Sequence, residues 1–228
     1  MFDEEAVDVL RHFTRLKCRL MPYLYARALE ARDTGCPLMR AMLLEFPDDP
    51  TSHYLDRQYM LGESLLVAPV FADDGAVTYY LPAGRWTSYL TGEVIEGPRW
   101  VTETHGALSL PLMVRPNSIL AVGSRDERPD YDYGDGVTLQ VYELADGQAA
   151  SAVVPSLSGD VAGTVEAARQ GQTITVTVRG QVAHWQLLLV GVKSIASVDG
   201  GSVENDPSGT RIRPDDTDRL TIQLAGSA

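Results

Sequence analysis

The sequence predicts a mainly β protein, in which two antiparallel β-sandwich-like domains follow one helix–strand unit. Three observations carry this prediction. An apolar stripe at helical spacing fills the first part of the chain, and a nearly continuous apolar run follows it at Leu38–Phe46. From Leu65 onward, short β-branched runs alternate with glycine turns about every eight residues, which is typical of a sandwich. The length of 228 residues suits one or two domains.

The N-terminal helix is predicted from its caps and its apolar spacing. Asp3 can cap the first turn, the acids that follow suit the positive end of the helix dipole, and Gly35 is a suitable residue just past the end. Pro22 lies inside the pattern, so we expect a kink or a division of the helix there. The stripe consists of Val7, Leu10, Phe13, Leu16, Leu20 and Leu24.

The run Leu38–Phe46 predicts a strand that is buried on both faces, as in a parallel sheet or barrel covered by helices. Helix before strand is the order of an α/β unit, and only one such unit is present. A single parallel strand leaves its edges unpaired, so we expect the chain to be a piece of something larger, with the N-terminal helix and Leu38–Phe46 as its weak part. A turn at Pro47–Pro50 separates it from a second predicted strand, Leu65–Phe71.

The rest of the chain predicts two β-domains. A first β-domain is expected to end near Gly123, and the polar, turn-rich stretch 124–136 to be a linker. Hairpins then continue from Val137 to the end of the chain. The predicted divisions are therefore 1–63, 64–123, 124–136 and 137–228. Residues 64–228 hold their own strands and turns, and we expect them to fold without the N-terminal piece.

Composition excludes several classes of partner. The formal net charge of −12 argues against binding to nucleic acid or to an anionic membrane surface. No apolar run approaches the ~20 residues of a membrane span, and no signal peptide is visible at the N-terminus. Cys18 and Cys36 stand alone and are expected to be small buried hydrophobes in a reducing compartment. We therefore expect a cytoplasmic protein with no membrane or nucleic-acid partner.

Charged side chains near Pro47 are the first candidates for chemistry. Four carboxylates follow the predicted buried strand, where α/β enzymes place catalytic groups, and paired carboxylates serve glycoside hydrolysis. The same residues also fit an ordinary turn and helix cap, which is the favoured interpretation. Arg40, inside the apolar run, needs a partner if it is buried, either a structural carboxylate outside this chain or part of a site. The four carboxylates are Glu45, Asp48, Asp49 and Asp56.

Histidines and aromatic residues give weaker signals. The histidines share no metal-ligand spacing, and no nucleophile elbow or phosphate-binding loop is present, so no metal site and no cofactor are expected. Exposed aromatics on a β-sandwich can stack on sugars, although such residues are more often in the core or an interface. The histidines are His12, His53, His105 and His184; the aromatics are Trp86, Trp100, Trp185, Tyr79, Tyr80, Tyr89, Tyr131, Tyr133 and Tyr142.

Several segments, in order, resemble glycoside hydrolase family 31, and within it bacterial α-xylosidases. The segments are LKCRLMPYLYARALEARDTGCP, LMRAMLLEFPDDP, YLDRQYMLGESLLVAPVF, YYLPAGRWTSYLTGEVIEG, THGALSLPLMVRPNSILAVG and RPDYDY. The resemblance covers essentially the whole chain and is strongest from Leu16 to Tyr133. It implies a retaining glycosidase built on a (β/α)8 barrel, with a proximal and a distal β-domain behind the barrel. Residues 1–63 would then be the last helix–strand elements of the barrel.

The resemblance also implies what this chain lacks. The family's catalytic aspartates lie on earlier barrel strands, and their motifs have no counterpart here. No catalytic, cofactor-binding or metal-binding residue is therefore assigned to this chain. We expect it to support the barrel and the oligomer contacts of a homo-oligomeric enzyme that binds its carbohydrate substrate through the full-length barrel, and to be inactive alone. The alternatives are the C-terminal part of an α-glucosidase and a non-catalytic carbohydrate-binding or assembly module.

Overall fold

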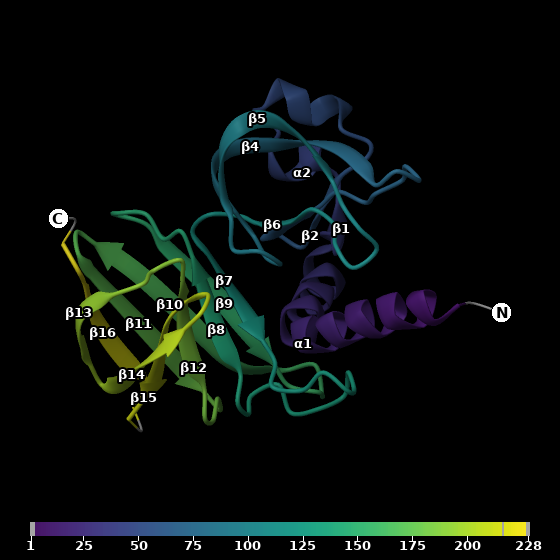
Figure 1. The fold of residues 1–228 in the computed structure, drawn as a ribbon. Coiled ribbons are helices and arrows are strands. Elements are labelled where there is room, and N and C mark those ends of the chain that lie inside the picture. Colours follow the sequence, from purple (N-terminus) through teal and green to yellow (C-terminus); the bar gives the residue numbers. More distant parts are fainter. Residues whose placement is uncertain (1–2, 216, 227–228) are drawn as a thin grey trace. The chain divides into compact units, whose positions relative to one another are not determined.

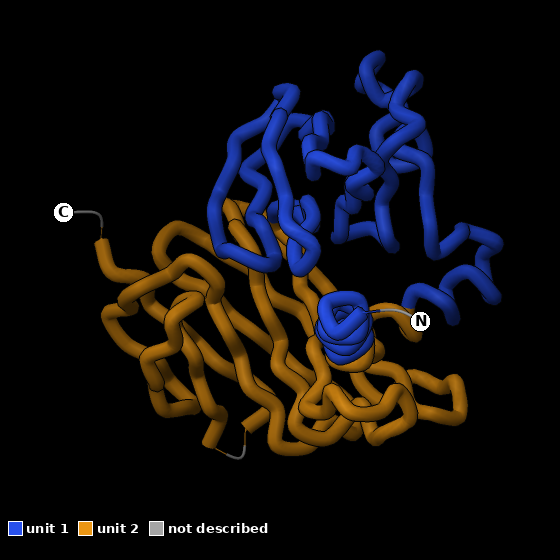
Figure 2. The backbone as a smooth tube through the Cα atoms, turned by 45° about the vertical axis from the view of Figure 1, so that its right-hand side comes forward, with its two compact units in different colours: residues 1–16, 27–116 blue, residues 17–26, 117–228 orange. Residues whose placement is uncertain are grey.

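The computed structural model describes residues 3–215 and 217–226, and its elements are shown in Figure 1. The packing of the backbone divides the chain into two compact units, coloured in Figure 2. Unit 1 comprises Met1–Leu16 and Arg27–Pro116, and unit 2 comprises Lys17–Ala26 and Asn117–Ala228. Strands dominate both units, so the prediction of a mainly β protein is confirmed.

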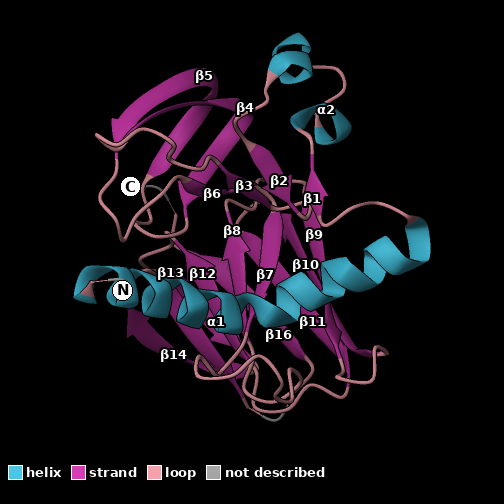
Figure 3. Cartoon of the chain, turned by 90° about the vertical axis from the view of Figure 1, so that its right-hand side faces the viewer, coloured by secondary structure: helices cyan, strands magenta, loops and turns pink. Residues whose placement is uncertain are grey.

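The N-terminal helix α1 runs from Glu4 to Thr34 as one element, the long helix in Figure 3. The Asp3 side chain accepts a hydrogen bond from the Ala6 N–H, and Gly35 ends the helix in the left-handed conformation at φ 79°. Both predicted caps are therefore confirmed. Pro22 lies inside the helix without dividing it, so only the division expected there is wrong.

Unit 1 contains one six-stranded sheet in the order β1-β2-β3-β6-β4-β5, with every neighbouring pair antiparallel. Two short helical segments connect β1 to β2. Its core packs Met42 and Met60 against Trp86 from β4. The elements are β1 (Met39–Arg40), α2 (Met42–Glu45), η1 (Pro50–Tyr54), β2 (Tyr59–Leu61), β3 (Leu65–Val67), β4 (Ala76–Ser88), β5 (Val94–Thr104) and β6 (Leu112–Val114).

The expected buried strand at Leu38–Phe46 is wrong. Only Met39 and Arg40 form a strand, which pairs antiparallel with β2 of the same chain, and α2 begins two residues later. Leu43 and Leu44 are 46% and 53% exposed, so the run is not buried on both faces. An apolar run of this length does not by itself distinguish a strand from a short helix. The expected parallel strand without neighbours is therefore also wrong, because β1 pairs with β2 of the same chain.

Unit 2 is a sandwich of two five-stranded sheets, ordered β13-β16-β11-β10-β9 and β14-β15-β12-β8-β7. Side chains from both sheets, such as Leu139, Val176 and Leu187, form one core. Pairing is antiparallel except between β8 and β12. The strands are β7 (Ser118–Val122), β8 (Thr138–Tyr142), β9 (Ala149–Pro155), β10 (Val161–Gln170), β11 (Thr173–Gly180), β12 (Gln186–Val190), β13 (Ile195–Asp199), β14 (Gly201–Asp206), β15 (Gly209–Pro214) and β16 (Arg219–Leu224).

The packing divides the chain at different positions from those expected. The strand Ser118–Val122 pairs with β8 and so lies in unit 2, before the boundary expected near Gly123. The stretch 124–136 contains no helix or strand, as a linker would, but Tyr131 and Tyr133 are buried in the core of unit 2. Their neighbours in the sequence are polar, so the local composition does not indicate that these two tyrosines are buried. The division into 1–63, 64–123, 124–136 and 137–228 stays a prediction about functional domains.

Candidate functional site

Arg40 lies at the centre of an ionic network in unit 1. Its side chain is 3% exposed. Nη1 donates to Glu45 Oε1 at 2.6 Å, Nη2 donates to Glu30 Oε2 at 2.8 Å, and Nε donates to the Pro37 carbonyl at 2.9 Å. The partners expected from outside the chain, or from a site, are thus structural glutamates of this chain. Each donor of the guanidinium fork that is named here has an acceptor at hydrogen-bond distance.

The network extends from Arg40 to three further residues. Arg115 Nη1 donates to the second oxygen of Glu45 at 2.9 Å, and Arg27 Nη1 bridges Glu30 at 2.9 Å and Glu63 at 2.7 Å. Three arginines and three glutamates therefore compensate one another. Burial by itself would lower the pKa of Arg40, but the hydrogen bond to Glu45 and the charge of Glu30 outweigh it and raise this pKa. The network therefore joins side chains of opposite charge from α1, β1 and α2 by direct hydrogen bonds.

The other candidate carboxylates, Asp48, Asp49 and Asp56, differ in their surroundings. Asp49 caps η1: its Oδ1 accepts from the Thr51 N–H at 3.0 Å, and its Oδ2 accepts from the Tyr80 hydroxyl at 2.8 Å. Asp48 and Asp56 are exposed. The turn-and-cap interpretation therefore describes Asp49, while Glu45 serves the ionic network. Retaining glycoside chemistry needs two carboxyl groups that face one sugar. Glu45 and Asp49 are used in structural hydrogen bonds, so these carboxylates do not form such a pair.

The four histidines are also dispersed. His105 Nε2 lies 3.0 Å from Glu103 Oε1 and its Nδ1 lies 2.8 Å from Ser109 Oγ, while the Tyr79 hydroxyl donates to the same Glu103 oxygen at 2.9 Å. Burial, together with Glu103, raises the pKa of Tyr79. His53 contacts the Pro47 carbonyl, His184 contacts Asp135, and His12 packs on Phe13. Among the residues that the structure describes, no group of three or more His, Cys, Asp or Glu could hold a metal ion.

The aromatic residues are mostly core residues. Trp86 is fully buried and Trp185 is 6% exposed, whereas Trp100 on β5 is 54% exposed. Tyr89 is half-buried. Cys18 is buried and Cys36 is half-buried, and both are free thiols. The tyrosines 79, 80, 131, 133 and 142 are all buried. Trp100 is thus the singled-out aromatic residue that the structure leaves open to solvent.

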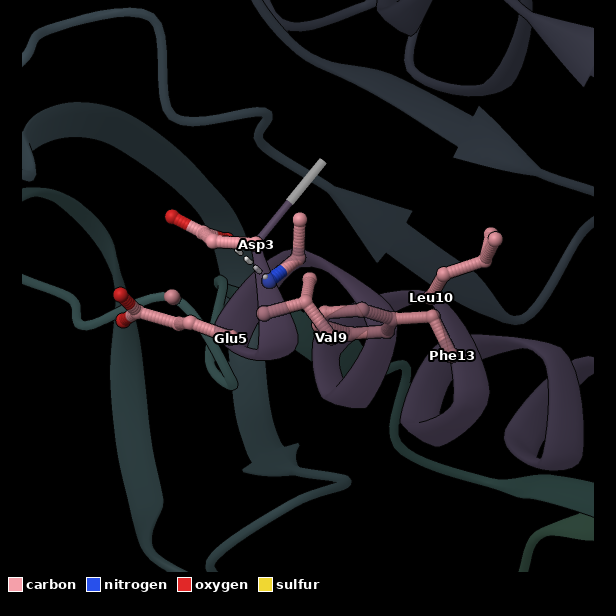
Figure 4. Close-up of a pocket in the computed structure, with 7 residues that line it drawn as sticks. Asp3, Glu5, Val9, Leu10 and Phe13 are labelled. Carbon is pink, nitrogen blue, oxygen red and sulfur yellow. Dashed lines mark hydrogen bonds between the residues drawn. The ribbon is translucent and has the colours of Figure 1, made fainter. Parts of the chain in front are cut away.

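A groove of about 560 Å³ lies along the first turns of α1 (Figure 4). Val9, Leu10 and Phe13 line it, and Leu10 is 70% exposed. Asp3 at its end is occupied as the helix cap, as the dashed line in Figure 4 shows. The remaining lining residues are Glu5, Ala6 and Ala107. Most of the side chains that line this groove are apolar, which suits packing against another apolar surface. None of the four candidate carboxylates lines it.

Comparisons with protein-family models match two consecutive parts of the chain. The model described as the glycosyl hydrolase family 31 C-terminal domain matches residues 35–120. The model described as the C-terminal domain of the alpha-xylosidase YicI matches residues 132–224. The first match begins directly after α1, and β1 to β6 lie inside it. No helix in the described part of the chain is long and apolar enough to cross a membrane.

Curated relatives include two α-xylosidases. The chain is 41% identical to alpha-xylosidase XylQ of Lactiplantibacillus pentosus over 78% of this chain and 24% of that protein. It is 44% identical to an alpha-xylosidase of Emericella nidulans over 62% of this chain and 19% of that protein. Alpha-glucosidase 2 of Bacillus thermoamyloliquefaciens is 30% identical over 65% of this chain and 19% of that protein. The chain therefore spans a quarter or less of the length of these three relatives.

Solved structures share the fold. The GH31 dextranase of Flavobacterium johnsoniae superposes with a TM-score of 0.80 at 23% identity, covering 97% of this chain and 33% of that one. The cycloalternan-forming enzyme of Listeria monocytogenes gives a TM-score of 0.83 at 19% identity, covering 97% of this chain and 24% of that one. At these identities the likeness establishes the arrangement of elements and nothing finer.

Proposed function

Because the chain belongs to glycoside hydrolase family 31, as an α-xylosidase-like C-terminal portion, we propose that it is the C-terminal part of a retaining enzyme that hydrolyses terminal α-xylosides. One observation carries the proposal: two C-terminal domain models of this family match in order along the chain, and the second is that of an alpha-xylosidase. Hydrolysis would proceed in two displacements through a covalent glycosyl-enzyme, on carboxylates supplied by the catalytic barrel.

In this proposal, the chain supports the barrel and contributes no reacting group. The amphipathic helix α1 would belong to the outer layer of the barrel, and its exposed Leu10 and the groove beside it would pack there. The ionic network around Arg40 would keep the end of α1 fixed to the sheet of unit 1. We also propose that the full enzyme is a homo-oligomer in which these domains make contacts, which sedimentation of the full-length protein would test.

The isolated chain is then expected to hydrolyse no aryl α-xyloside or α-glucoside. Its carboxylates nearest the expected joint, Glu45 and Asp49, are committed to structural hydrogen bonds. The assay uses purified chain at high concentration. Turnover that disappears on Asp48→Asn or Asp49→Asn would overturn the proposal and move the reaction into this segment.

A chimera tests the supporting role directly. The matched 78% of this chain would replace the corresponding segment of XylQ, and α-xylosidase activity would be compared with intact XylQ and with XylQ lacking the segment. We expect an active chimera and an inactive truncation. A folded, inactive chimera would contradict the proposal. The alternative, an α-glucosidase part, requires the sequence upstream of this chain to encode a barrel that prefers α-glucosides.

A further inference from the structure

Trp100 is the exposed member of an aromatic pair on the β4–β5 hairpin. It lies opposite Tyr80 in the ladder, with ring centroids 5.5 Å apart and ring planes inclined by 55°. Tyr80 is 7% exposed and Trp100 is 54% exposed. The hairpin therefore presents an indole ring to solvent and supports it from below with a buried phenol ring.

Tyr80 itself is held firmly in place. Its hydroxyl donates to Asp49 Oδ2 at 2.8 Å, its N–H donates to Gln58 Oε1 at 2.7 Å, and its carbonyl accepts from Gln58 Nε2 at 2.8 Å. Strand β4 pairs with β6 only at Thr87 and Ser88, so the buried amide of Gln58 replaces a neighbouring strand beside Tyr80. Tyr80 is therefore an ordered support for the Trp100 ring. A site that is ordered before binding loses less conformational entropy when a ligand binds.

Hydroxyl groups lie beside Trp100 on the same face of the hairpin. Thr78 and Thr102, the next pair on the same face of the hairpin, are exposed, and their hydroxyl oxygens lie 2.9 Å apart. Asp49 adds one carboxylate at the hydroxyl end of Tyr80. We name the set Asp49, Thr78, Tyr80, Trp100 and Thr102 the Trp100 face. One exposed indole amid hydroxyl groups is far smaller than the ~800 Å² that a stable protein interface buries on each partner.

We propose that the Trp100 face binds a pyranose unit of an α-linked oligosaccharide. The C–H face of a pyranose ring matches an indole in size and polarity, and its hydroxyl groups can pair with threonine hydroxyls and a carboxylate. The exposed indole beside the two threonine hydroxyls favours a polyol with an apolar ring face. The choice of an α-linked sugar rests on the proposed function, whereas the binding site itself rests on the geometry of this hairpin.

Tryptophan fluorescence of the whole chain tests the proposal, because Trp86 and Trp185 are buried and Trp100 is the exposed indole. The probe is isomaltotriose, titrated to about 20 mM, with retardation in a gel containing dextran as the second readout. We expect saturable binding. In the gel, which does not need the indole as a reporter, Trp100→Ala should weaken binding about tenfold or more, and Trp100→Phe should retain part of it. The matched control is Phe71→Ala, which removes a 71% exposed aromatic residue outside the Trp100 face.

Three outcomes would overturn the proposal. They are no binding to either probe, binding that survives Trp100→Ala in a folded variant, and a concentration-dependent blue shift without sugar, which would place a second copy of the chain on the indole. Activity of the XylQ chimera is measured separately, so a failure of sugar binding leaves the proposed supporting role intact. Conversely, an inactive chimera would not remove a binding site measured on the chain alone.

Discussion

At the scale of single residues, Arg40 explains how a charged side chain can occupy an apolar run. It is buried because Glu30 precedes it on α1 and Glu45 follows it on α2, so carboxylates from two elements reach the same guanidinium. Arg115 supports Glu45 from the other side while its guanidinium stacks on the Phe46 ring, 4.6 Å from the centroid. Removing one partner of such a buried ion pair is destabilising, chiefly because the other charge stays buried without compensation.

We predict that Arg40→Met destabilises the chain by about 3 kcal/mol, because Glu45 and Glu30 each lose a buried partner. Arg40→Lys should recover little of this, since an ammonium cannot span two carboxylates and a carbonyl as the fork does. Urea unfolding measures both. The control is Arg11→Met, which breaks an exposed pair with Asp8 and should cost less than about 1 kcal/mol. Equal losses for Arg40 and Arg11 variants would contradict the assigned role.

Asp206 in unit 2 gives a pH-dependent prediction. Burial by itself would raise the pKa of Asp206, but hydrogen bonds from the Ser208 N–H and from Arg211 outweigh it and hold this pKa below its ordinary value of 3.8. A depressed folded-state pKa contributes stability above the unfolded pKa, and that stability is lost as pH falls through the folded pKa. The charged carboxylate thus stabilises unit 2 at neutral pH.

Asp206→Asn should therefore be less stable than the parent chain at pH 6, and the difference should shrink below about pH 4. Urea unfolding at several pH values between 6 and 3 measures this. Asp199→Asn, which changes an exposed acidic residue at the end of β13 in the same unit, serves as the control. A difference that grows on acidification would contradict the assignment.

At the scale of elements, Pro22 links α1 to the core of unit 2. A helical residue at this position would donate its N–H to the Cys18 carbonyl, and proline has none. The Tyr131 hydroxyl donates to that carbonyl instead, at 2.7 Å, and the Gly123 N–H donates to the next one, at Arg19, also at 2.7 Å. The carbonyls freed by a proline are commonly satisfied by such neighbours. The segment Lys17–Ala26 is fixed to unit 2 in this way.

A double-mutant cycle tests this substitution of one donor for another. Tyr131→Phe should cost about 1–3 kcal/mol, because it leaves the buried Cys18 carbonyl without its donor. In a Pro22→Ala background, the backbone N–H that the substitution restores can reach that carbonyl, so the same change should cost measurably less. Tyr133→Phe, whose hydroxyl donates to Pro129, is the matched control and should show no coupling to Pro22→Ala. Additive effects of Pro22→Ala and Tyr131→Phe would contradict the interpretation.

At the scale of the whole molecule, the N-terminal 60 residues are part of both compact units. Met42 and Met60 are fully buried in the core of unit 1, and Met21 and Tyr25 pack against the core of unit 2. A boundary near residue 64 would therefore cut through both cores. The expectation that residues 64–228 fold without the N-terminal piece stays a prediction, and these contacts argue against it for unit 1.

We predict that a chain beginning at Leu61 loses the fold of unit 1, because removal of each buried methionine costs about 2–5 kcal/mol. Unit 2 should survive with reduced stability, since it keeps both sheets of its sandwich. Tryptophan emission separates the units once the exposed Trp100 is also replaced by Phe. Trp86 should become solvent-exposed in the Trp100→Phe/Trp185→Phe background, and Trp185 should stay buried in the Trp86→Phe/Trp100→Phe background. Full-length chains with the same substitutions are the controls. Buried emission from Trp86 in the short chain would restore the original expectation.

The sequence by itself determined the features that depend on near neighbours. The helix from Glu4 to Thr34 follows from its caps and apolar spacing, and most strands follow from turn residues and β-branched runs, because these preferences act within a few residues. The motifs of the family are likewise contiguous segments, so they too could be recognised without a structure.

Only the tertiary structure decided the rest. It decided that Leu38–Phe46 is a two-residue strand and a helical turn, that Arg40 pairs with Glu30 and Glu45, and that Tyr131 reaches the carbonyl freed by Pro22. It also decided that Trp100 remains exposed where Trp86 is buried. The reason is the same throughout: burial and pairing depend on residues brought from distant parts of the chain, as Tyr131 is to Cys18, and such partners leave no local pattern.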